Sequence, residues 1–353
     1  MEVSVVLATY NGDKYLQAQL DSIERQWLPP REVIVGDDGS TDNTLSILDS
    51  FSRKSPLEFR ILSNPRNLGY AENFLAAAAR ATSPWIAFCD QDDVWHETKL
   101  SRIAEELKKE PDQNEIMMVV HCAKIVDGDL KPTGERYPAF KKTQRVRRNG
   151  AHGFSVLPGF AKVVRRHLIS DLPWKRRPRS WHPSEDKLTH DKWTNMQANA
   201  LGDSLLIPGN LAYYRRHQRT VTAQSKRVSL ATRIRLSAAS DRPHHMYRSV
   251  VAAECALFQH TCASEAVDTK TARSLYENAQ LYGRLSDIEW QRALVRSGGL
   301  GARFSEWLQL WRCAYGSEDP FHAVPASSIL RDLLAVSGGL RPKRSQQRSS
   351  ASS

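Results

Sequence analysis

Residues 1–108 alternate four times between a short apolar run and a segment whose apolar residues recur every three or four positions. Such runs are typical of buried strands, and the recurrent spacing is typical of amphipathic helices. Repeated strand–helix units predict a parallel sheet with helices on both faces. The expected strands are Val3 to Ala8, Glu32 to Gly36, Phe59 to Leu62 and Trp85 to Cys89, and the expected helices are Lys14 to Gln26, the segment with Leu45, Leu48 and Phe51, Tyr70 to Ala81, and the segment with Leu100, Ile103 and Leu107.

Carboxylates follow two of these strands. Asp37 and Asp38 follow the second strand, and Asp90, Asp92 and Asp93 follow the fourth. The carboxyl ends of parallel strands meet at one edge of a sheet, where open α/β sheets bind ligands. Carboxylates packed closely repel one another, and a divalent cation is the simplest relief of that repulsion. The sequence therefore predicts an acidic, cation-binding crevice at this edge.

Plainer interpretations of these acids stay open. The later group also fits a solvated acidic loop before a helix that starts near Glu97, with Asp93 or Thr98 near its cap. Asp37 and Asp38 also fit turn and cap chemistry, a role that suits Asp42 best. The glycine fingerprints of dinucleotide and P-loop sites are absent, which argues against an ordinary site of either kind.

Four motifs, in this order and at these spacings, resemble those of a known family. VVLATYNG, EVIVGDDGSTD, NLGYAENF and FCDQDDVW look like the nucleotide-sugar domain of family 2 inverting glycosyltransferases. DQDDVW together with the later HDKW is similar to the rhamnosyltransferase-like branch. The motifs cover residues 3–99, and the resemblance extends more weakly to about residue 222. It implies an α/β GT-A fold, Rossmann-like and mostly parallel, that binds a nucleotide-diphosphate sugar.

The resemblance also implies roles for individual residues. In such proteins the residues around Thr9, Tyr10 and Asn11 hold the base, and Asp37 or Asp38 accepts hydrogen bonds from the base or ribose. Asp90 would contact the ribose, and Asp92 would coordinate Mn²⁺ or Mg²⁺ that bridges the two phosphates. Gly69 is expected to allow close backbone approach, with a plain turn as the alternative. The implied donor site thus contains the residues Thr9, Tyr10, Asn11, Asp37, Asp38, Gly69, Asp90 and Asp92.

A second candidate stands at the start of a later helix. Inverting glycosyl transfer is a single displacement, and it needs a general base to take the proton of the acceptor hydroxyl. The family places a carboxylate at the start of a helix for this task, and Asp191 in the run THDKW matches that position. Glu185 and Asp186 are its rivals, and the alternative for Asp191 is a helix-start acid favoured by the helix dipole.

The segment 206–222 resembles the strand and loop that close the donor site in this family. Tyr214, Arg215 and His217 match a Y-R-x-H pattern. His217 is a candidate metal ligand or a donor to the diphosphate, with Arg215 or Arg216 neutralising charge. A surface histidine in a basic loop is the alternative.

Charge and composition divide the chain further. Residues 1–100 carry a balance of −6, residues 101–220 one of +10 and residues 221–353 one of +7. We expect a GT-A domain over 1–222, with a nucleotide-sugar half at 1–100 and an acceptor half at 101–222. A helical extension is expected over 223–337 and a disordered basic tail over 338–353. The segment 131–150 is expected to be a long basic loop.

The sequence predicts a cytoplasmic protein. The opening residues predict a strand rather than a signal peptide, no apolar run is long enough to span a membrane, and the five scattered cysteines lack a CxxC pair. Basic charge and the aromatic segment Phe304 to Trp311 favour a lipid-linked or glycan acceptor and peripheral contact with the inner face of the membrane, although such a stripe more often packs into a core.

The predicted function is a metal-dependent inverting glycosyltransferase of bacterial surface polysaccharide synthesis. Two alternatives are a nucleic-acid-binding protein, suggested by the net charge of +11, and a catalytically silent membrane-associated scaffold. The acidic first hundred residues argue against nucleic acid as a partner.

Overall fold

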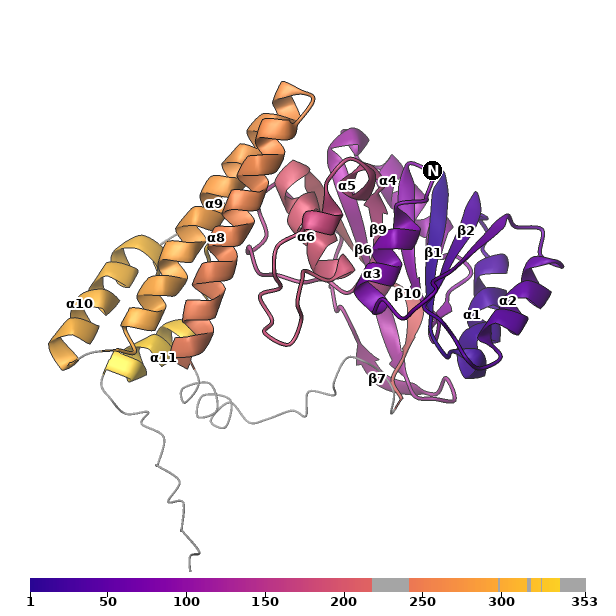
Figure 1. Cartoon of the computed structure of the whole chain (residues 1–353), viewed down its shortest axis with the longest axis horizontal. Coiled ribbons are helices and arrows are strands. Elements are labelled where there is room, and N and C mark those ends of the chain that lie inside the picture. Colours follow the sequence, from indigo (N-terminus) through magenta and orange to yellow (C-terminus); the bar gives the residue numbers. More distant parts are fainter. Residues whose placement is uncertain (218–240, 298, 316–318, 325, 337–353) are drawn as a thin grey trace, which may run out of the picture.

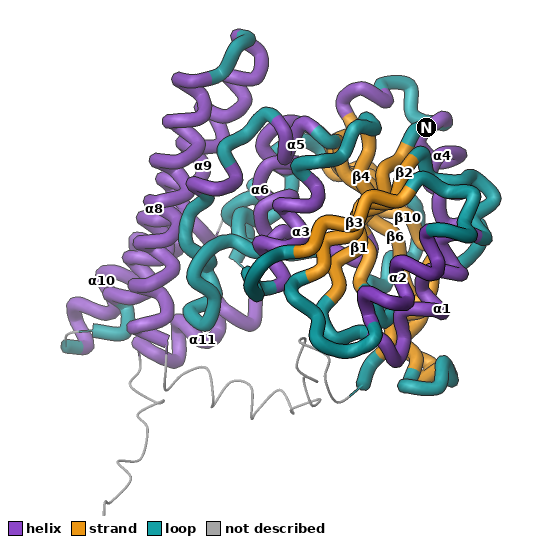
Figure 2. Tube along the Cα trace, turned by 45° about the vertical axis from the view of Figure 1, so that its right-hand side comes forward, coloured by secondary structure: helices purple, strands orange, loops and turns teal. Residues whose placement is uncertain are grey.

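The computed structural model describes residues 1–217, 241–297, 299–315, 319–324 and 326–336 (Figure 1). Within these residues one mixed sheet runs in the order β3-β2-β1-β4-β9-β6-β10-β5, with β7 paired to β6 and β8 to β10. Figure 2 shows α1, α2 and α4 on one side of this sheet and α3, α5 and α6 on the other. The expected α/β architecture is confirmed.

The first half of the sheet is parallel and follows the predicted strand–helix units. Its strands are β1 (Val3–Thr9), β2 (Glu32–Asp37), β3 (Phe59–Ser63) and β4 (Trp85–Asp90), and its helices are α1 (Asp13–Glu24), α2 (Thr44–Ser52), α3 (Tyr70–Ala78) and α4 (Lys99–Lys108). The apolar residues that predicted α1, namely Leu16, Leu20 and Ile23, are fully buried. Burial of one face of each helix against the sheet explains why this local pattern was sufficient.

The second half is mixed, because β9 lies antiparallel between β4 and β6. Its elements are β5 (Val94–Trp95), η1 (Gln113–Glu115), β6 (Ile116–Val126), β7 (Pro132–Arg136), β8 (Gln144–Val146), η2 (Gly159–Ala161), β9 (Lys162–Arg165), α5 (His167–Ser170), η3 (Trp174–Arg176), α6 (His190–Leu201) and β10 (Asp203–Arg215).

Two local expectations are corrected here. The predicted loop 131–150 contains β7, whose exposed residues give no apolar alternation from which a strand could be read, and the three-residue strand β8, which is too short to show one. Helix α4 begins at Lys99 with Thr98 at its cap, and Asp93 lies buried, away from that cap.

The expected helical extension is present in the described residues. It comprises α8 (Asp241–Glu265), α9 (Thr269–Leu294), α10 (Leu300–Leu310), the π turn η4 (Trp311–Tyr315) and α11 (Ala326–Val336). α8 and α9 form an antiparallel hairpin beside α6 (Figure 1). Residues 223–240, expected in this extension, and the expected tail 338–353 lie outside the described residues.

The hairpin and the sheet share one hydrophobic core. Val251 and Cys255 of α8 and Tyr282 and Leu285 of α9 belong to the same buried cluster as the strands. The Tyr282 hydroxyl donates to the Gly153 carbonyl at 2.7 Å. No helix among the described residues combines the length and the apolar character that crossing a membrane requires.

Candidate active site

The strand register brings the predicted donor residues to one edge. Thr9 pairs with Asp37, and Ala8 pairs with Asp90, so that β1, β2 and β4 end at the same level. Because these strands are parallel, the loops that follow them share one crevice edge. The two acidic groups that the sequence separates by about fifty residues are therefore neighbours.

A compact hydrogen-bond network joins the first two of these loops. Asp37 is fully buried, and its carboxylate accepts from Thr9 Oγ1 at 2.9 Å and from the Ser40 N–H at 3.0 Å. The Asn11 side chain accepts from the Thr41 N–H at 2.8 Å. Thr9, Asn11 and Asp37 are thus brought together as expected, and Asp37 holds the loop rather than facing solvent.

Tyr10 projects outward from this network. Its side chain is 48% exposed, which leaves the ring face open to stack on a planar ligand. The backbone of Tyr10 is fixed in both directions by Gln91, whose Oε1 accepts from the Tyr10 N–H at 2.8 Å and whose Nε2 donates to the Tyr10 carbonyl at 3.0 Å. Gln91 was not singled out from the sequence, and its position between Asp90 and Asp92 was the available signal.

Asp38 orders the loop before α3. It is buried, and its carboxylate accepts from the N–H groups of Leu68 at 2.7 Å and Gly69 at 2.9 Å, and from Asn64 at 3.1 Å. Gly69 has φ +84° with open space around its missing side chain. The left-handed backbone of this turn favours glycine, and close approach of a ligand to Gly69 stays a prediction.

Two distant parts of the chain meet at the acidic loop after β4. His217 Nε2 lies 2.7 Å from Asp92 Oδ2, and the His217 ring packs on Tyr15 with centroids 4.9 Å apart. Burial and the charges of Asp92 and Asp191 raise the pKa of Asp90 to about 7. The loop therefore holds Asp90 and Asp92 at one place, with His217 delivered from the end of β10.

Arg215 stabilises this loop from within. Its N–H donates to Asp93 Oδ1 at 3.0 Å, its Nε donates to the Asp92 carbonyl at 2.7 Å, and its guanidinium lies 4.4 Å from the centroid of the Tyr15 ring. Arg215 is only 4% exposed. Two guanidinium donors, Nε and Nη1, are used on the backbone carbonyls of Asp92 and Gly128, and the expectation that Arg215 neutralises a diphosphate stays a prediction.

Lys99 is a functional candidate that sequence reasoning missed. It is fully buried, its Nζ donates to the Phe160 carbonyl at 3.0 Å, and it lies 3.7 Å above the Trp95 ring. Burial lowers the pKa of Lys99 to about 7, against the opposing influence of Cys89, Asp93 and Asp90. A positive charge thus lies beneath the acidic loop.

Asp191 faces the same edge from the first turn of α6. Its Oδ1 accepts from the Thr189 hydroxyl and, at 2.8 Å, from the Lys192 N–H. Burial favours a higher pKa for Asp191, but His190, Lys162 and these hydrogen bonds outweigh it and lower the pKa. Together with burial, the charges of Glu185, Asp191 and Asp90 raise the pKa of the Tyr70 hydroxyl, so these carboxylates act on the same point.

The rivals of Asp191 are placed less favourably. The Glu185 carboxylate pairs with Lys192 Nζ and accepts from Ser180 Oγ at 2.6 Å. Asp186 is exposed. Of the three predicted candidates, Asp191 is the one that combines enclosure with proximity to Asp90.

The acidic loop is chemically suited to a divalent cation. Asp92 and His217 offer an oxygen and a nitrogen ligand at one point, and the buried carboxylate oxygen Oδ2 of Asp93 has no hydrogen-bond partner. The described residues contain no ready group of three or more metal ligands. Mg²⁺ is commonly held by one or two protein groups together with substrate phosphates, and this donor set fits that pattern.

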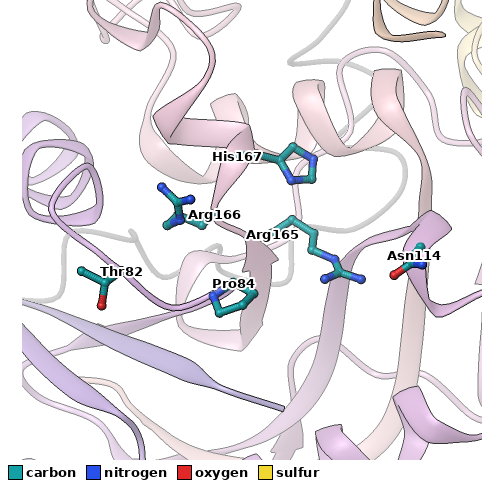
Figure 3. Close-up of a pocket in the computed structure, with 6 residues that line it drawn as sticks. All are labelled: Thr82, Pro84, Asn114, Arg165, Arg166 and His167. Carbon is teal, nitrogen blue, oxygen red and sulfur yellow. The ribbon is translucent and has the colours of Figure 1, made fainter. Parts of the chain in front are cut away.

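A cavity lies at the opposite edge of the sheet. It has a volume of about 350 Å³ and is lined by Thr82, Pro84, Asn114, Arg165, Arg166 and His167, near the amino end of β4 (Figure 3). The Arg165 side chain points toward Asn114, and the Arg166 side chain points away from it. Arg165 is also bound to the carbonyls of Ile116 and Gln113. The cations of this cavity do not converge, and it is remote from the carboxylate edge.

A mixed sheet with a parallel first half and acidic residues at its carboxyl edge fits the GT-A class of glycosyltransferase fold. Residues 4–172 match the sequence profile of Glycosyl transferase family 2. This segment is therefore a family 2 glycosyltransferase domain, which confirms the resemblance seen in the motifs. The matched segment ends before Asp191, Arg215 and His217, whose roles stay predictions.

Individual relatives agree with this assignment. An uncharacterized glycosyltransferase, alr2836 of Nostoc sp., is 33% identical over 223 residues, which are 62% of this chain and 65% of the relative. The dTDP-rhamnosyl transferase RfbG of Shigella flexneri is 36% identical over 98 residues, 27% of this chain and 34% of the relative. These relatives are thus matched over less than two thirds of their length.

A solved structure shares the fold. TarS 1-349 of S. aureus superimposes with a TM-score of 0.51 over 96% of this chain and 91% of that chain, at 17% sequence identity. This likeness concerns the fold alone.

Proposed function

We propose that this protein is a metal-dependent inverting glycosyltransferase. It transfers a sugar from a nucleotide-diphosphate donor to a hydroxyl of a glycan or lipid-linked oligosaccharide, in the assembly of a bacterial surface polysaccharide. The observation that carries the proposal is the meeting of Asp92 with His217, 2.7 Å apart, at the edge that Asp90 and Asp191 also face. A nucleic-acid partner is disfavoured, because these carboxylates would repel a polyanion.

The donor would lie across the ends of β1, β2 and β4. Tyr10 is exposed and suited to stack on the base, while Thr9 and Asn11 shape the pocket through Asp37 and Ser40. In this proposal Asp37 and Asp38 position the loops, and Asp90 accepts hydrogen bonds from the ribose. The similarity to RfbG makes a dTDP-deoxysugar such as dTDP-rhamnose the first donor to test.

Asp92 and His217 would hold Mn²⁺ or Mg²⁺. The ion would offset the charge of the diphosphate as it leaves. Arg215 fixes the backbone of Asp92 and Asp93 and so keeps the two ligands together. Its contribution is positional.

Asp191 would take the proton of the acceptor hydroxyl. Oδ1 is held by Thr189 and the Lys192 N–H, whereas no donor among the described residues reaches Oδ2. A carboxylate with one oxygen fixed and the other available is oriented for general-base catalysis. Its lowered pKa keeps it ionised at neutral pH.

Peripheral contact with an anionic membrane would bring the enzyme to a lipid-linked acceptor on the cytoplasmic side. α10 and η4 expose an apolar stripe of Leu300, Phe304 and Trp311. The residues from 341 to 348 add the basic residues Arg341, Lys343, Arg344 and Arg348 and no acid. Exposed apolar residues together with basic charge in the same chain favour an anionic lipid surface over a neutral one.

Calorimetric titration tests the donor and metal assignments together. Nucleoside diphosphates of several bases, with dTDP first, are titrated into the protein with Mn²⁺ and then with chelator. We expect metal-dependent binding of one nucleotide, with at least tenfold weaker binding in Asp92→Asn and unchanged binding in Asp129→Asn, an exposed acid on the neighbouring loop. Equal affinity with chelator, or in Asp92→Asn, would contradict the metal assignment.

A second measurement separates the candidate bases. With the donor identified, Asp191→Asn should lower kcat by about a hundredfold or more while nucleotide binding is retained, since a general base contributes that much. Glu185→Gln and Asp186→Asn serve as comparisons. If either of them abolishes turnover and Asp191→Asn does not, the base is assigned wrongly.

A further inference from the structure

Lys162 is a buried lysine beneath the first turn of α6. It begins β9, is paired with Val120 of β6, and is 0% exposed. Its Nζ donates to the backbone carbonyl of Asp191 at 2.6 Å and lies 3.4 Å from Thr194 Oγ1. The sequence gives no hint of this burial, because a lysine at the start of a strand is ordinarily solvated.

Helix stability alone does not explain this position. The amino end of a helix carries a partial positive charge, so a cation there is unfavourable. Burial adds to the cost, and it lowers the pKa of Lys162 to about 7. The opposing influence is the charge of Asp191, which favours the ammonium form of Lys162.

The other cations near Asp191 have carboxylate partners of their own. Lys192 pairs with Glu185, and Arg177 pairs with Glu72 at 2.6 Å. Within the described residues Lys162 forms no such pair and binds the peptide carbonyl of Asp191 instead. A direct ion pair would occupy the carboxylate, whereas this contact leaves Oδ2 available.

We propose that Lys162 is the positioning residue of Asp191: its ammonium fixes the first turn of α6 through the backbone and supplies positive charge close to the carboxylate without covering it. The proposal rests on the proposed function only in naming Asp191 as the base. The charge coupling between the two side chains holds or fails independently of any transferase activity.

Several other titratable groups lie around Asp191. His190 packs against Phe74 with ring centroids 4.2 Å apart, and burial lowers its pKa to about 4, so that it is neutral at pH 7. The remaining groups from the elements packed here are Tyr70, Asp90, Tyr137, Arg177, Glu185 and Lys192. Lys162 is protonated throughout the acidic range in which Asp191 titrates, so it contributes a full positive charge there.

The decisive measurement is the pKa of Asp191 in the intact protein. The protein is labelled with ¹³C at aspartate carboxylates, and Asp191→Asn assigns the resonance. In Lys162→Met we expect the Asp191 pKa to rise by about one unit, with recovery in Lys162→Arg. Lys192→Met is the matched control. The Lys192 ammonium binds Glu185 and Ser180, so its removal should leave the Asp191 pKa unchanged. An unchanged pKa in folded Lys162→Met overturns the proposal.

The reciprocal experiment covers the case in which Lys162→Met does not fold. Coupling between two charges is mutual, so the isosteric Asp191→Asn should lower the pKa of Lys162 below its value of about 7. Lysine side chains labelled with ¹³C report this, with Lys162→Arg identifying the resonance. A Lys162 pKa that is the same in Asp191→Asn refutes the coupling. Where a donor and acceptor are in hand, the acidic limb of kcat/KM should shift upward in Lys162→Met as well, a change that a purely structural lysine would not produce.

Discussion

Removal of two exposed aromatic rings from α10 and η4 should detach the protein from anionic membranes. Phe304 is 52% exposed, Trp311 is 54% exposed, and Leu300 beside them is 67% exposed. Trp307 packs between the two rings, with centroids 6.0 Å from Phe304 and 5.6 Å from Trp311. The stripe is therefore continuous along one face, and the perturbation is the double variant Phe304→Ser, Trp311→Ser.

The exposed fractions set the size of the effect. An aromatic side chain has about 200 Å² of surface, so each of these rings presents about 100 Å² to solvent. At about 25 cal/mol per Å², complete insertion of one ring yields about 2.5 kcal/mol, and partial insertion about 1.5 kcal/mol. The double variant should then bind about 3 kcal/mol more weakly, which is roughly a hundredfold in affinity.

Co-sedimentation with vesicles measures the membrane affinity of the wild type and the double variant. The wild-type protein should sediment with vesicles that contain phosphatidylglycerol, and less so with phosphatidylcholine alone or at higher salt, because part of the attraction is electrostatic. Tyr276→Ser, which removes a 47% exposed ring from the far part of the hairpin, is the control and should bind like wild type. No sedimentation of the wild type, or equal binding by the double variant, refutes the reasoning. A loss of self-association in the double variant would instead identify the stripe as a contact between copies.

Three further changes test the packing. Glu32→Gln should lower the free energy of unfolding by about 2 kcal/mol at pH 7, since the carboxylate accepts four hydrogen bonds and its pKa is lowered to about 2. Because the pKa of Glu32 is lowered, its carboxylate stabilises the folded state above the unfolded pKa of 4.5, and this stabilisation is lost as pH falls toward 2. Urea titrations of wild type and variant should therefore converge on acidification. Asp332→Asn should cost about 3 kcal/mol in the same assay, because it leaves Arg292 and Arg296 buried without their carboxylate. An unchanged urea midpoint would mean that solvent takes the place of the carboxylate at the two arginines. Gly69→Ala should cost about 1 kcal/mol through its positive φ, and a thermal midpoint equal to wild type would contradict that strain.

The first half of the fold was predictable because its signals are local. Leu16, Leu20 and Ile23 repeat at helical spacing, and the strands before the acidic loops contain the apolar runs Val33 to Val35 and Trp85 to Cys89. The edge of the sheet at which the candidate residues meet was also predictable, because Thr9 and Asp90 lie at the carboxyl ends of parallel strands. Here periodicity and topology together were enough.

The features that were missed depend on contacts between distant segments. β7 is made of exposed polar residues, and only its pairing with β6 makes it a strand. The apolar residues of α8 and α9 predicted helices, but helical spacing does not reveal which surface they cover. Tyr282 is buried against Gly153 and Phe321 and belongs to the core of the sheet. The helical extension after residue 222 therefore shares its core with the residues before it.

The two buried lysines change the electrostatic argument for the metal. Counting acids in the sequence leaves a divalent cation as the simplest relief of repulsion after β4, and Lys99 beneath the acidic loop supplies part of that relief, because burial lowers its pKa to about 7. Lys162 contributes in the same way near Asp191. The raised pKa of Asp90 shows that repulsion from Asp92 and Asp191 remains, so the lysines do not replace the cation. The inference of a metal rests above all on the pairing of Asp92 with His217, whose nitrogen and oxygen meet from positions 125 residues apart in the chain.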